Sequence, residues 1–311
     1  MPKNFPDIWI GRVEKNLKNT DEAPWLEGVS EIPGDVIVVG EGTDAEKCLI
    51  HIPTTDFEPD VLINNTTYPI ALQAYTDDSV EIALDKYQTK VTTLSDDEIL
   101  GATYDKIDTA TKTHTSSINT SKFGKAIHAI APTSDSANTP VVKTSGDDDG
   151  TGRKMFTKND IVKLKKRFDD AQIPQTGRRL VLCSDHISDL LLKDQVFAGQ
   201  YYNYENGKIA KAYGFDIYEY VANPHYNATT ATKKSYGAVP AAGDYMASVA
   251  FYVPNVGKKT GITKQYFSES KGDPENQTNK LNYRHYFIAV PKRAKYIGAI
   301  ISDVVPVPSE P

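Results

Sequence analysis

The distribution of apolar and polar residues separates strand-like ends from a helical middle. Apolar runs at 35–40 and 48–52, divided by a Gly-Glu-Gly-Thr segment, predict two strands. Apolar and polar residues then alternate from 80 to 85, which is the period of a half-buried strand. Residues 36–94 show no helical period, so we predict a long β-ribbon there. Because two or three strands alone are marginally stable in water, this ribbon needs a surface to lie on.

A long helix is predicted to follow the ribbon. Ser95 and Glu98 form a Ser-x-x-Glu capping box, and apolar residues recur at helical spacing through Ile118 toward Ile127. A helix over residues 95–127 would span about 50 Å at 1.5 Å per residue. Its interior is rich in Thr and Ser, which are poor helix formers, so packing rather than propensity must hold it.

Two shorter helices are predicted in the middle of the chain. One is amphipathic, begins near Thr157 and ends before Pro174; the other follows a strand at 180–183, with Ser184 as its N-cap. Beyond residue 200 the pattern predicts strands at 215–221, 246–253, 262–267, 281–290 and 296–302. Helices grouped between two strand-rich ends do not give a βαβ alternation, so the predicted fold class is α+β.

The first thirty-five residues are predicted to form an N-terminal arm. Trp25 and Leu26 are isolated apolar anchors among polar residues. An extended terminus with such anchors needs a surface to lie on. That surface is either its own domain or a neighbouring subunit.

Composition places the chain among globular proteins and adds one unusual feature. Of the 311 residues, 39% are hydrophobic and 24% charged, which argues against wholesale disorder. Tyrosine is in excess, with 18 Tyr against 10 Phe and 2 Trp. Tyrosine suits surfaces that become buried against a partner, and it equally suits the strands of a β-rich fold. Composition leaves both interpretations open.

Charge and cysteine content exclude several classes of protein. A net charge of −6 argues against the chain as a whole being a nucleic-acid-binding protein. No stretch approaches eighteen apolar residues, so no membrane span is expected, and the N-terminus has no apolar core of a secretory signal. Cys48 and Cys183 lie in separate apolar runs, where we expect buried free thiols.

No motif in the sequence predicts a catalytic, cofactor-binding or metal-binding site. Ser184, Asp185 and His186 are triad residue types, but residues adjacent in sequence cannot form a triad, and Ser184 is better explained as a helix cap. The acidic run 147–149 lacks the alternating ligands of a calcium loop, and the basic cluster 163–167 fits a solvated helix face. There is no zinc spacing and no phosphate-binding glycine motif. We therefore expect no enzyme and no cofactor.

Several blocks of sequence are together specific enough to indicate a family. Residues 54–70, Thr-Thr-Asp-Phe-Glu-Pro-Asp-Val-Leu-Ile-Asn-Asn-Thr-Thr-Tyr-Pro-Ile, resemble a block in capsid proteins of phages and prophages of gut bacteria. Later stretches resemble the same group in the same order: 182–186, 194–204, 273–277 and 283–288. The chain thus resembles the major capsid proteins of tailed bacteriophages.

This resemblance implies a layout for the fold. It implies the HK-ninety-seven-type fold, with residues 1–35 as the N-terminal arm and 36–94 as the extended E-loop. A peripheral domain with the spine helix would occupy 95–180, and most of the axial domain 181–275. Residues 276–311 would return to the peripheral domain.

The resemblance also implies function and partners. Subunits would assemble with themselves into pentamers and hexamers of an icosahedral shell, with each ribbon lying across a neighbour. The shell would enclose DNA without sequence-specific binding and would form the virion capsid, assembled in the host cytoplasm. Because the long N-terminal extension of some relatives is missing, the resemblance implies either a separate scaffolding protein or a processed form of the chain. It also implies a portal. In some relatives a ribbon lysine is crosslinked to an asparagine, but no motif marks Lys86 or Lys90 for this role.

Three other functions remain open at this point. An encapsulin-like bacterial compartment would share the fold but enclose enzymes. A phage tail component would form tubes or rings. An enzyme would be a monomer or small oligomer with a polar pocket.

Overall fold

The computed structural model describes residues 13–17, 22–39, 46–54, 60–73, 78–95, 106–201, 208–273 and 275–305. Its largest sheet has six strands in the order β6-β16-β13-β7-β9-β8. Their bounds are Val141–Lys143 (β6), Ile297–Ile301 (β16), Ser248–Tyr252 (β13), Arg178–Leu182 (β7), Phe215–Glu219 (β9) and Lys208–Ala212 (β8).

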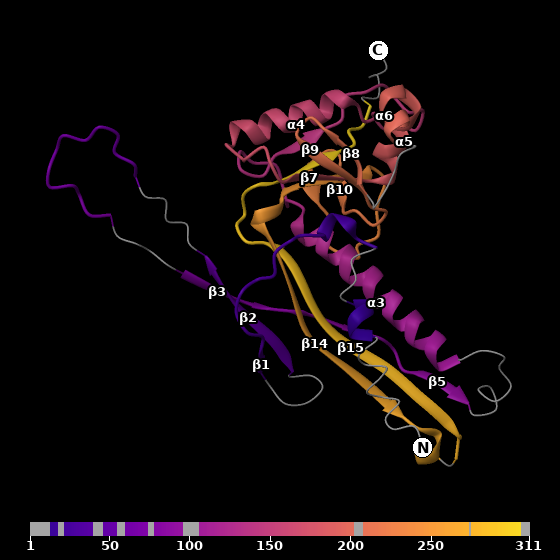
Figure 1. Cartoon of the computed structure of the whole chain (residues 1–311). Helices are drawn as coiled ribbons and strands as arrows, with labels where there is room; N and C mark the ends of the chain where they lie inside the picture. Colours follow the sequence, from indigo (N-terminus) through magenta and orange to yellow (C-terminus); the bar gives the residue numbers. More distant parts are fainter. Residues whose placement is uncertain are drawn as a thin grey trace.

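Helices cover both faces of this sheet (Figure 1). Because strand residues alternate between faces, Leu180 and Leu182 pack in one buried cluster with helix α4 (Lys158–Asp170), while Val181 packs in another with helix α3 (Lys106–Ile130). Helices α5 (Ser184–Lys193) and α6 (Gln195–Tyr201) follow β7. This burial on both faces explains why β7, β13 and β16 read as continuous apolar runs.

A second sheet is long, narrow and runs alongside α3 (Figure 1). Strands β14 (Val256–Ser268) and β15 (Thr278–Pro291) form an extended antiparallel hairpin. Strands β4 (Asp85–Gln88) and β5 (Thr92–Ser95) both pair with β15. The last part of the predicted ribbon therefore belongs to this long sheet.

A third sheet carries the part of the chain that stands away from the body. It has the order β1-β2-β3, with bounds Ile37–Val39, Lys47–Thr54 and Asp78–Ala83. A small sheet, β11-β10-β12, lies at Thr232–Lys233, His225–Asn227 and Asp244–Met246. Single 3-10 turns occur at Pro24–Leu26 (η1), Val253–Asn255 (η2) and Ser270–Gly272 (η3).

Helix α3 confirms the body of the predicted long helix but leaves its start open. It includes Ile118 and Ile127 and ends at Ile130. Ser95 is the last residue of strand β5, and Glu98 lies outside the described residues.

The two shorter helices differ in how well their starts were predicted. The helix predicted to begin near Thr157 does so: Thr157 is the N-cap of α4 and forms a capping box with Asp160. The prediction for Ser184 was wrong. The N-cap of α5 is Cys183, no side chain caps that helix, and Ser184 is its first helical residue. The apolar run that ends in Cys183 stays extended up to the first helical turn, which shifts the boundary by one residue.

The predicted C-terminal strands are confirmed at β9, β13, β14, β15 and β16. Strands β6, β8, β10 and β11 were not predicted, since each is short and carries a weak apolar pattern. Within the described ranges, none of the helices has the length and apolar character needed to cross a membrane.

Candidate assembly surface

Residues 47–83, here called the projecting hairpin, leave the body as strands β2 and β3 (Figure 1). The strands pair from Leu49 with Ala83 out to Thr54 with Asp78. At the far end, residues 60–73 form the hairpin tip.

The tip is organised by its own hydrogen bonds. Thr67 N donates to Asn65 Oδ1 at 3.0 Å, and Asn65 Nδ2 donates to Thr67 O at 2.8 Å. Asp60 N donates to Gln73 Oε1 at 3.0 Å, which joins the two ends of the tip. The tip therefore has a defined local structure without contacts from the body.

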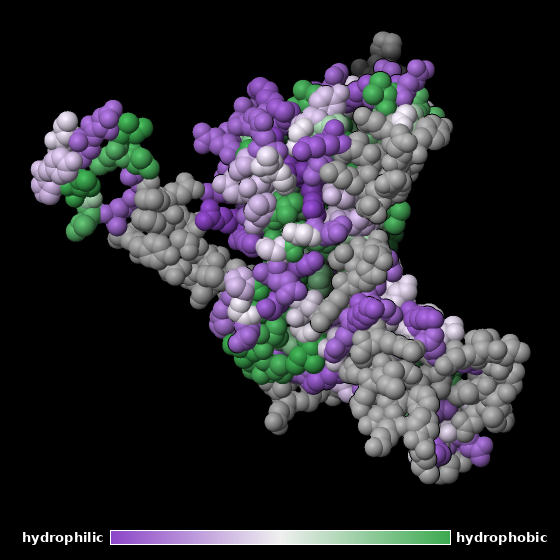
Figure 2. Space-filling model, in the orientation of Figure 1, coloured by the Kyte–Doolittle hydropathy of each residue, from purple (hydrophilic) through white to green (hydrophobic). Residues whose placement is uncertain are grey.

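Apolar side chains of the tip face solvent. Val61, Ile63 and Leu72 are 81%, 83% and 102% exposed, and Leu62, Tyr68 and Ile70 are also more than half exposed. Figure 2 shows these residues as an apolar patch at the end of the hairpin. An exposed apolar cluster of this kind is typical of an interaction surface.

The base of the hairpin is fixed, in contrast to its tip. Cys48 and Ile50 of β2 are fully buried with Leu84, Tyr286 and Ile288, among others. Glu46, just before β2, accepts hydrogen bonds from Lys264 Nζ at 2.8 Å and from Arg284 Nη1 at 3.3 Å. The hydrogen bond from Lys264 contributes most to lowering the pKa of Glu46. The hairpin therefore projects from a rigid attachment.

Residues 22–34, here called the N-terminal strap, lie on the body of their own subunit. Trp25 is fully buried and makes an edge contact with Tyr220 at 5.5 Å between ring centroids. Arg179 Nη1 donates to Trp25 O at 2.7 Å and Glu27 O at 2.6 Å. The sequence left open whether the arm lies on its own domain or on a neighbouring subunit. Residues 22–34 of the arm lie on their own domain. Residues 1–12 are outside the described part of the chain.

In the Ser184-Asp185-His186 sequence, the histidine is a core residue. His186 is fully buried and stacks on Phe156. Its Nδ1 lies 2.7 Å from Ser248 Oγ and its Nε2 lies 3.1 Å from Ser302 Oγ. Burial lowers the pKa of His186 to about 3, so the imidazole is neutral. It links strand β13, through Ser248, to Ser302, the residue after β16.

The acidic loop at 147–149 is held by internal contacts. Asp149 Oδ2 accepts from Arg153 Nε at 2.8 Å, and Arg153 makes a bidentate pair with Asp189 at 2.8 and 2.9 Å. Across the residues that the structure describes, no three His, Cys, Asp or Glu side chains gather as metal ligands would. Arg153 therefore attaches the acidic loop to the core.

The basic cluster 163–167 is neutralised by carboxylates. Lys163, Lys165, Lys166 and Arg167 pair respectively with Asp160, Asp169, Asp170 and Asp135, at N to O distances of 3.2, 2.6, 3.4 and 2.9 Å. Ion pairs at the surface contribute little stability, but here they balance the charge of this helix face.

Lys86 and Lys90, the ribbon lysines considered for crosslinking, are not on the projecting hairpin. Lys86 lies in β4 and Lys90 follows it, along the strand that pairs with β15. The apolar tip was not predicted as a surface from the sequence. Residues 61–63 and 68–72 have the composition of a buried segment, and only the geometry shows that they are exposed.

Comparison with known proteins assigns this geometry to a family. Residues 77–301 match the family model described as phage capsid protein. No curated protein matches the chain.

Solved structures share the fold at low sequence identity. The capsid of Ralstonia phage GP4 is similar with a TM-score of 0.59 and 8% identity, over 91% of this chain and 87% of that one. The capsid of cyanophage P-SCSP1u is similar with a TM-score of 0.56 and 14% identity, over 88% and 86%. A virus-like particle from Pyrococcus furiosus is similar with a TM-score of 0.53 and 10% identity, over 95% and 98%.

The family model covers most of the chain, and the solved capsids share its mixed helix and sheet fold over most of their own length. The expected α+β capsid fold is thereby confirmed. The chain belongs to the phage capsid protein family and is a structural subunit of a phage shell built from copies of itself.

Proposed function

We propose that this subunit builds the icosahedral shell of a tailed phage as pentamers and hexamers, in which each projecting hairpin lies across a neighbouring subunit. One observation supports the contact between the hairpin and a neighbouring subunit. The tip at 60–73 exposes apolar side chains, and it belongs to a hairpin whose base is buried in the body. Burying that tip on a neighbour removes apolar area from water, which is the main driving force of protein association.

The finer parts of the proposal concern location and partners. The subunit is assembled in the host cytoplasm with a separate scaffolding protein and a portal, and the shell encloses DNA without reading its sequence. Its role is structural rather than enzymatic. The layout remains the one that the resemblance implies, with an arm at 1–35, an E-loop at 36–94, peripheral parts at 95–180 and 276–311, and an axial domain at 181–275.

The compartment alternative shares the fold, because the virus-like particle from Pyrococcus furiosus is also similar. The match to a phage capsid family over residues 77–301 favours a virion shell. Nucleic acid rather than cargo protein inside purified particles would agree with this choice.

The experiment replaces apolar tip residues with polar ones. The double variant Ile63→Ser, Leu72→Ser is expressed with and without the scaffolding protein, and particles are counted by electron microscopy and sedimentation. We expect folded subunits and a loss of closed shells. Val162→Ser, an exposed apolar residue on the ion-paired helix α4, is the control and should assemble. A wild-type chain that stays monomeric under both conditions contradicts the proposal.

A further inference from the structure

Three side chains of the long sheet converge on Glu46, the residue just before the projecting hairpin. Lys264 of β14 and Arg284 of β15 lie directly opposite each other, and Tyr286 lies on the same face of the sheet, two residues further along β15. Lys264 Nζ and Arg284 Nη1 donate to Glu46 Oε2 at 2.8 and 3.3 Å. Tyr286 Oη lies 3.3 Å from Glu46 O and 3.4 Å from Glu46 Oε1, so its hydroxyl can donate to either oxygen. We call these four residues the hairpin lock.

The hairpin lock holds a buried cation that depends on Glu46. Arg284 is 1% exposed and Glu46 is 8% exposed. Among the described residues, Glu46 is the carboxylate that pairs with Arg284, whose Nε has no hydrogen-bond partner and whose guanidinium lies 5.2 Å from the ring centroid of Tyr266. Removing one partner of a buried ion pair is strongly destabilising, because the other charge is left without compensation. Movement of Glu46 away from this position is therefore costly.

The sheet surface beside the hairpin lock is shaped to receive the joint between the hairpin and the body. Leu84 connects β3 to β4, and its N donates to Cys48 O at 2.7 Å. Gly261 lies in a β-bulge of β14, where the pairing with β15 shifts register within residues 260–263. A Cβ at Gly261 would lie 2.8 Å from Tyr286 Cβ and 3.0 Å from Leu84 Cδ2. The glycine therefore leaves the space that Leu84 needs to pack against the long sheet.

Polar contacts give the joint a direction that apolar contacts alone would not. Hydrophobic packing is non-directional, whereas hydrogen bonds between charged groups require a specific geometry. Glu46 fixes the hairpin where β2 begins, and Leu84 fixes it where β3 ends. Because β2 and β3 stay paired out to Thr54 and Asp78, a rotation at the base moves the tip by a larger distance.

We propose that Glu46 is the positioning residue of the projecting hairpin, which sets the direction in which the tip meets a neighbouring subunit and so the curvature of the shell. The rotation between neighbouring subunits decides whether an assembly of identical contacts closes or stays open. This inference rests on the proposed function. It assigns the direction of the contact to a residue that is buried within its own subunit.

Distance measurements on free subunits test the positioning role. Spin labels on Ala71→Cys in the tip and Ala137→Cys in an exposed loop of the body report the direction of the hairpin, while the two native cysteines are buried. Double electron–electron resonance should give one narrow distance distribution for the labelled chain. Glu46→Gln, which keeps the shape of the side chain and removes its charge, should lose that narrow distribution. Glu81→Gln, an exposed carboxylate of β3, is the matched control and should keep it. An unchanged distribution in Glu46→Gln overturns the inference.

A second variant tests the same joint without changing its charge, and it decides the question if Glu46→Gln does not fold. In Gly261→Ala the added methyl group must displace Leu84 or Tyr286, so the mean distance between the two labels should shift. Gly272→Ala, where a Cβ would have no neighbour closer than 3.9 Å, is the control and should leave the distance unchanged. The same mean distance in Gly261→Ala and in the control contradicts a direction set at this joint.

The shape of the particles separates this inference from the proposed function. Glu46→Gln subunits keep the apolar tip, so they should still associate, but into open sheets and shells of mixed diameter in electron micrographs. Shells of the single wild-type diameter from Glu46→Gln overturn the inference and leave the shell role intact. A wild-type chain that forms no particles contradicts the proposed function itself.

Discussion

Lys122 is a cation buried in the middle of helix α3. It is 1% exposed, and its Nζ donates to the main-chain oxygen of Leu17. The same Nζ lies 4.7 Å from the ring centroid of Phe123 and 5.3 Å from that of Phe287. Burial lowers the pKa of Lys122 to about 7. The lysine thus attaches residues 13–17 to the long helix at an electrostatic cost.

We predict that Lys122→Met changes how stability depends on pH. Between pH 7 and about pH 10 the unfolded chain holds a proton on Lys122 that the folded chain has released, so the free energy of unfolding rises with pH. The variant lacks this part of the rise. Chemical denaturation at several pH values measures it, with Lys166→Met as an exposed control. Parallel curves for wild type and Lys122→Met would contradict the assignment.

Gly298 in strand β16 occupies a site with no space for a side chain. A Cβ there would lie 2.7 Å from Phe168 Cε1 and 3.0 Å from Pro140 O. Gly298→Ala should therefore lower the free energy of unfolding by about 1–3 kcal/mol. Gly199→Ala, in helix α6 with nothing within 4 Å, should be neutral or slightly stabilising. Equal stabilities of the two variants in urea unfolding would refute the packing argument.

At the residue scale, local chemistry was predictable and spatial partners were not. The capping box at Thr157 depends on residues three apart, and both are visible in the sequence. The partners of His186 are Ser248 and Ser302, which lie 62 and 116 residues away. No local pattern indicates that pairing. The Ser184 prediction failed because a serine at a strand-to-helix junction fits the N-cap and the first helical position equally well.

At the scale of elements, the N-terminal strap shows how a segment with little secondary structure becomes part of the core. Trp25 packs against Tyr220 and Phe251. Trp25→Ala should cost about 3–5 kcal/mol of stability and speed hydrogen exchange across 22–34. Leu72→Ala, at a fully exposed site, is the control and should leave subunit stability unchanged. An unaltered exchange rate in the strap of Trp25→Ala would contradict this role.

The period of apolar and polar residues predicted the longer helices and strands that pack against the core. Five strands and the amphipathic helix α4 were predicted because their burial pattern follows the strand or helical period; the strands are β9, β13, β14, β15 and β16. Short strands such as β10 were missed, since three residues carry no period. Tyrosine occurs both in the core and on the surface. Tyr226 and Tyr283 are buried on strands, whereas Tyr68 is exposed on the hairpin tip.

At the scale of the whole molecule, the free subunit and the assembled shell should differ in protease sensitivity at one place. Tyr68 and Leu72 are exposed in the free subunit and lie in a segment without strand pairing. Chymotrypsin should cut free subunits within 60–73 and leave two large fragments. Assembled particles should resist this cut, because a neighbour covers the tip. Equal cleavage of subunits and particles would show that the tip stays uncovered.

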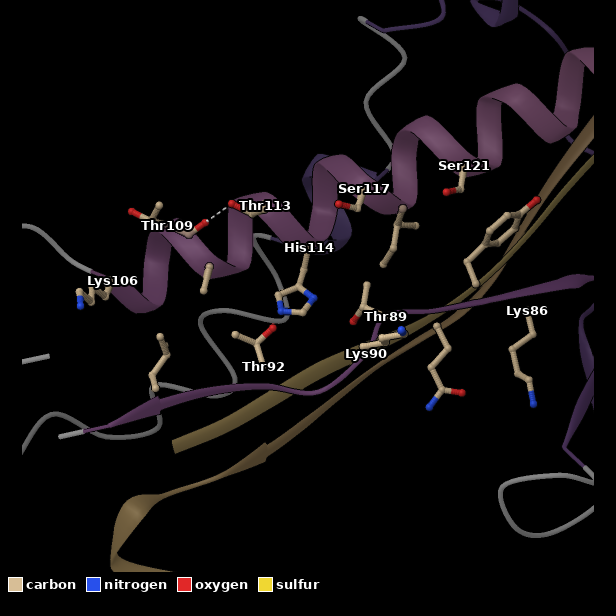
Figure 3. Close-up of a pocket in the computed structure, with 15 residues that line it drawn as sticks. Lys86, Thr89, Lys90, Thr92, Lys106, Thr109, Thr113, His114, Ser117 and Ser121 are labelled. Carbon is tan, nitrogen blue, oxygen red and sulfur yellow. Dashed lines mark hydrogen bonds between the residues drawn. The ribbon is translucent and has the colours of Figure 1, made fainter. Parts of the chain in front are cut away.

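The family was predictable from the combination of sequence blocks, while the assembly geometry was not. The block at 54–70 indicates the family, but its composition does not reveal that its apolar residues face solvent. The pocket between α3 and the strands β4 and β5 is lined by residues 86–94 and 106–121 (Figure 3), so only the folded chain brings its two sides together. An interface between copies depends on shape, and shape is not a local property of sequence.

The two buried thiols have a practical consequence. Cys48 and Cys183 are the only cysteines of the chain, both are free, and burial raises the pKa of each, to about 12 for Cys183. Neither will form a thiolate that reacts readily with maleimides at neutral pH. A single cysteine introduced on an exposed loop, for example at Ala137, would therefore be the one reactive handle per subunit. Fluorophores or antigens could be attached at that position in one copy per subunit, with both native cysteines left in place.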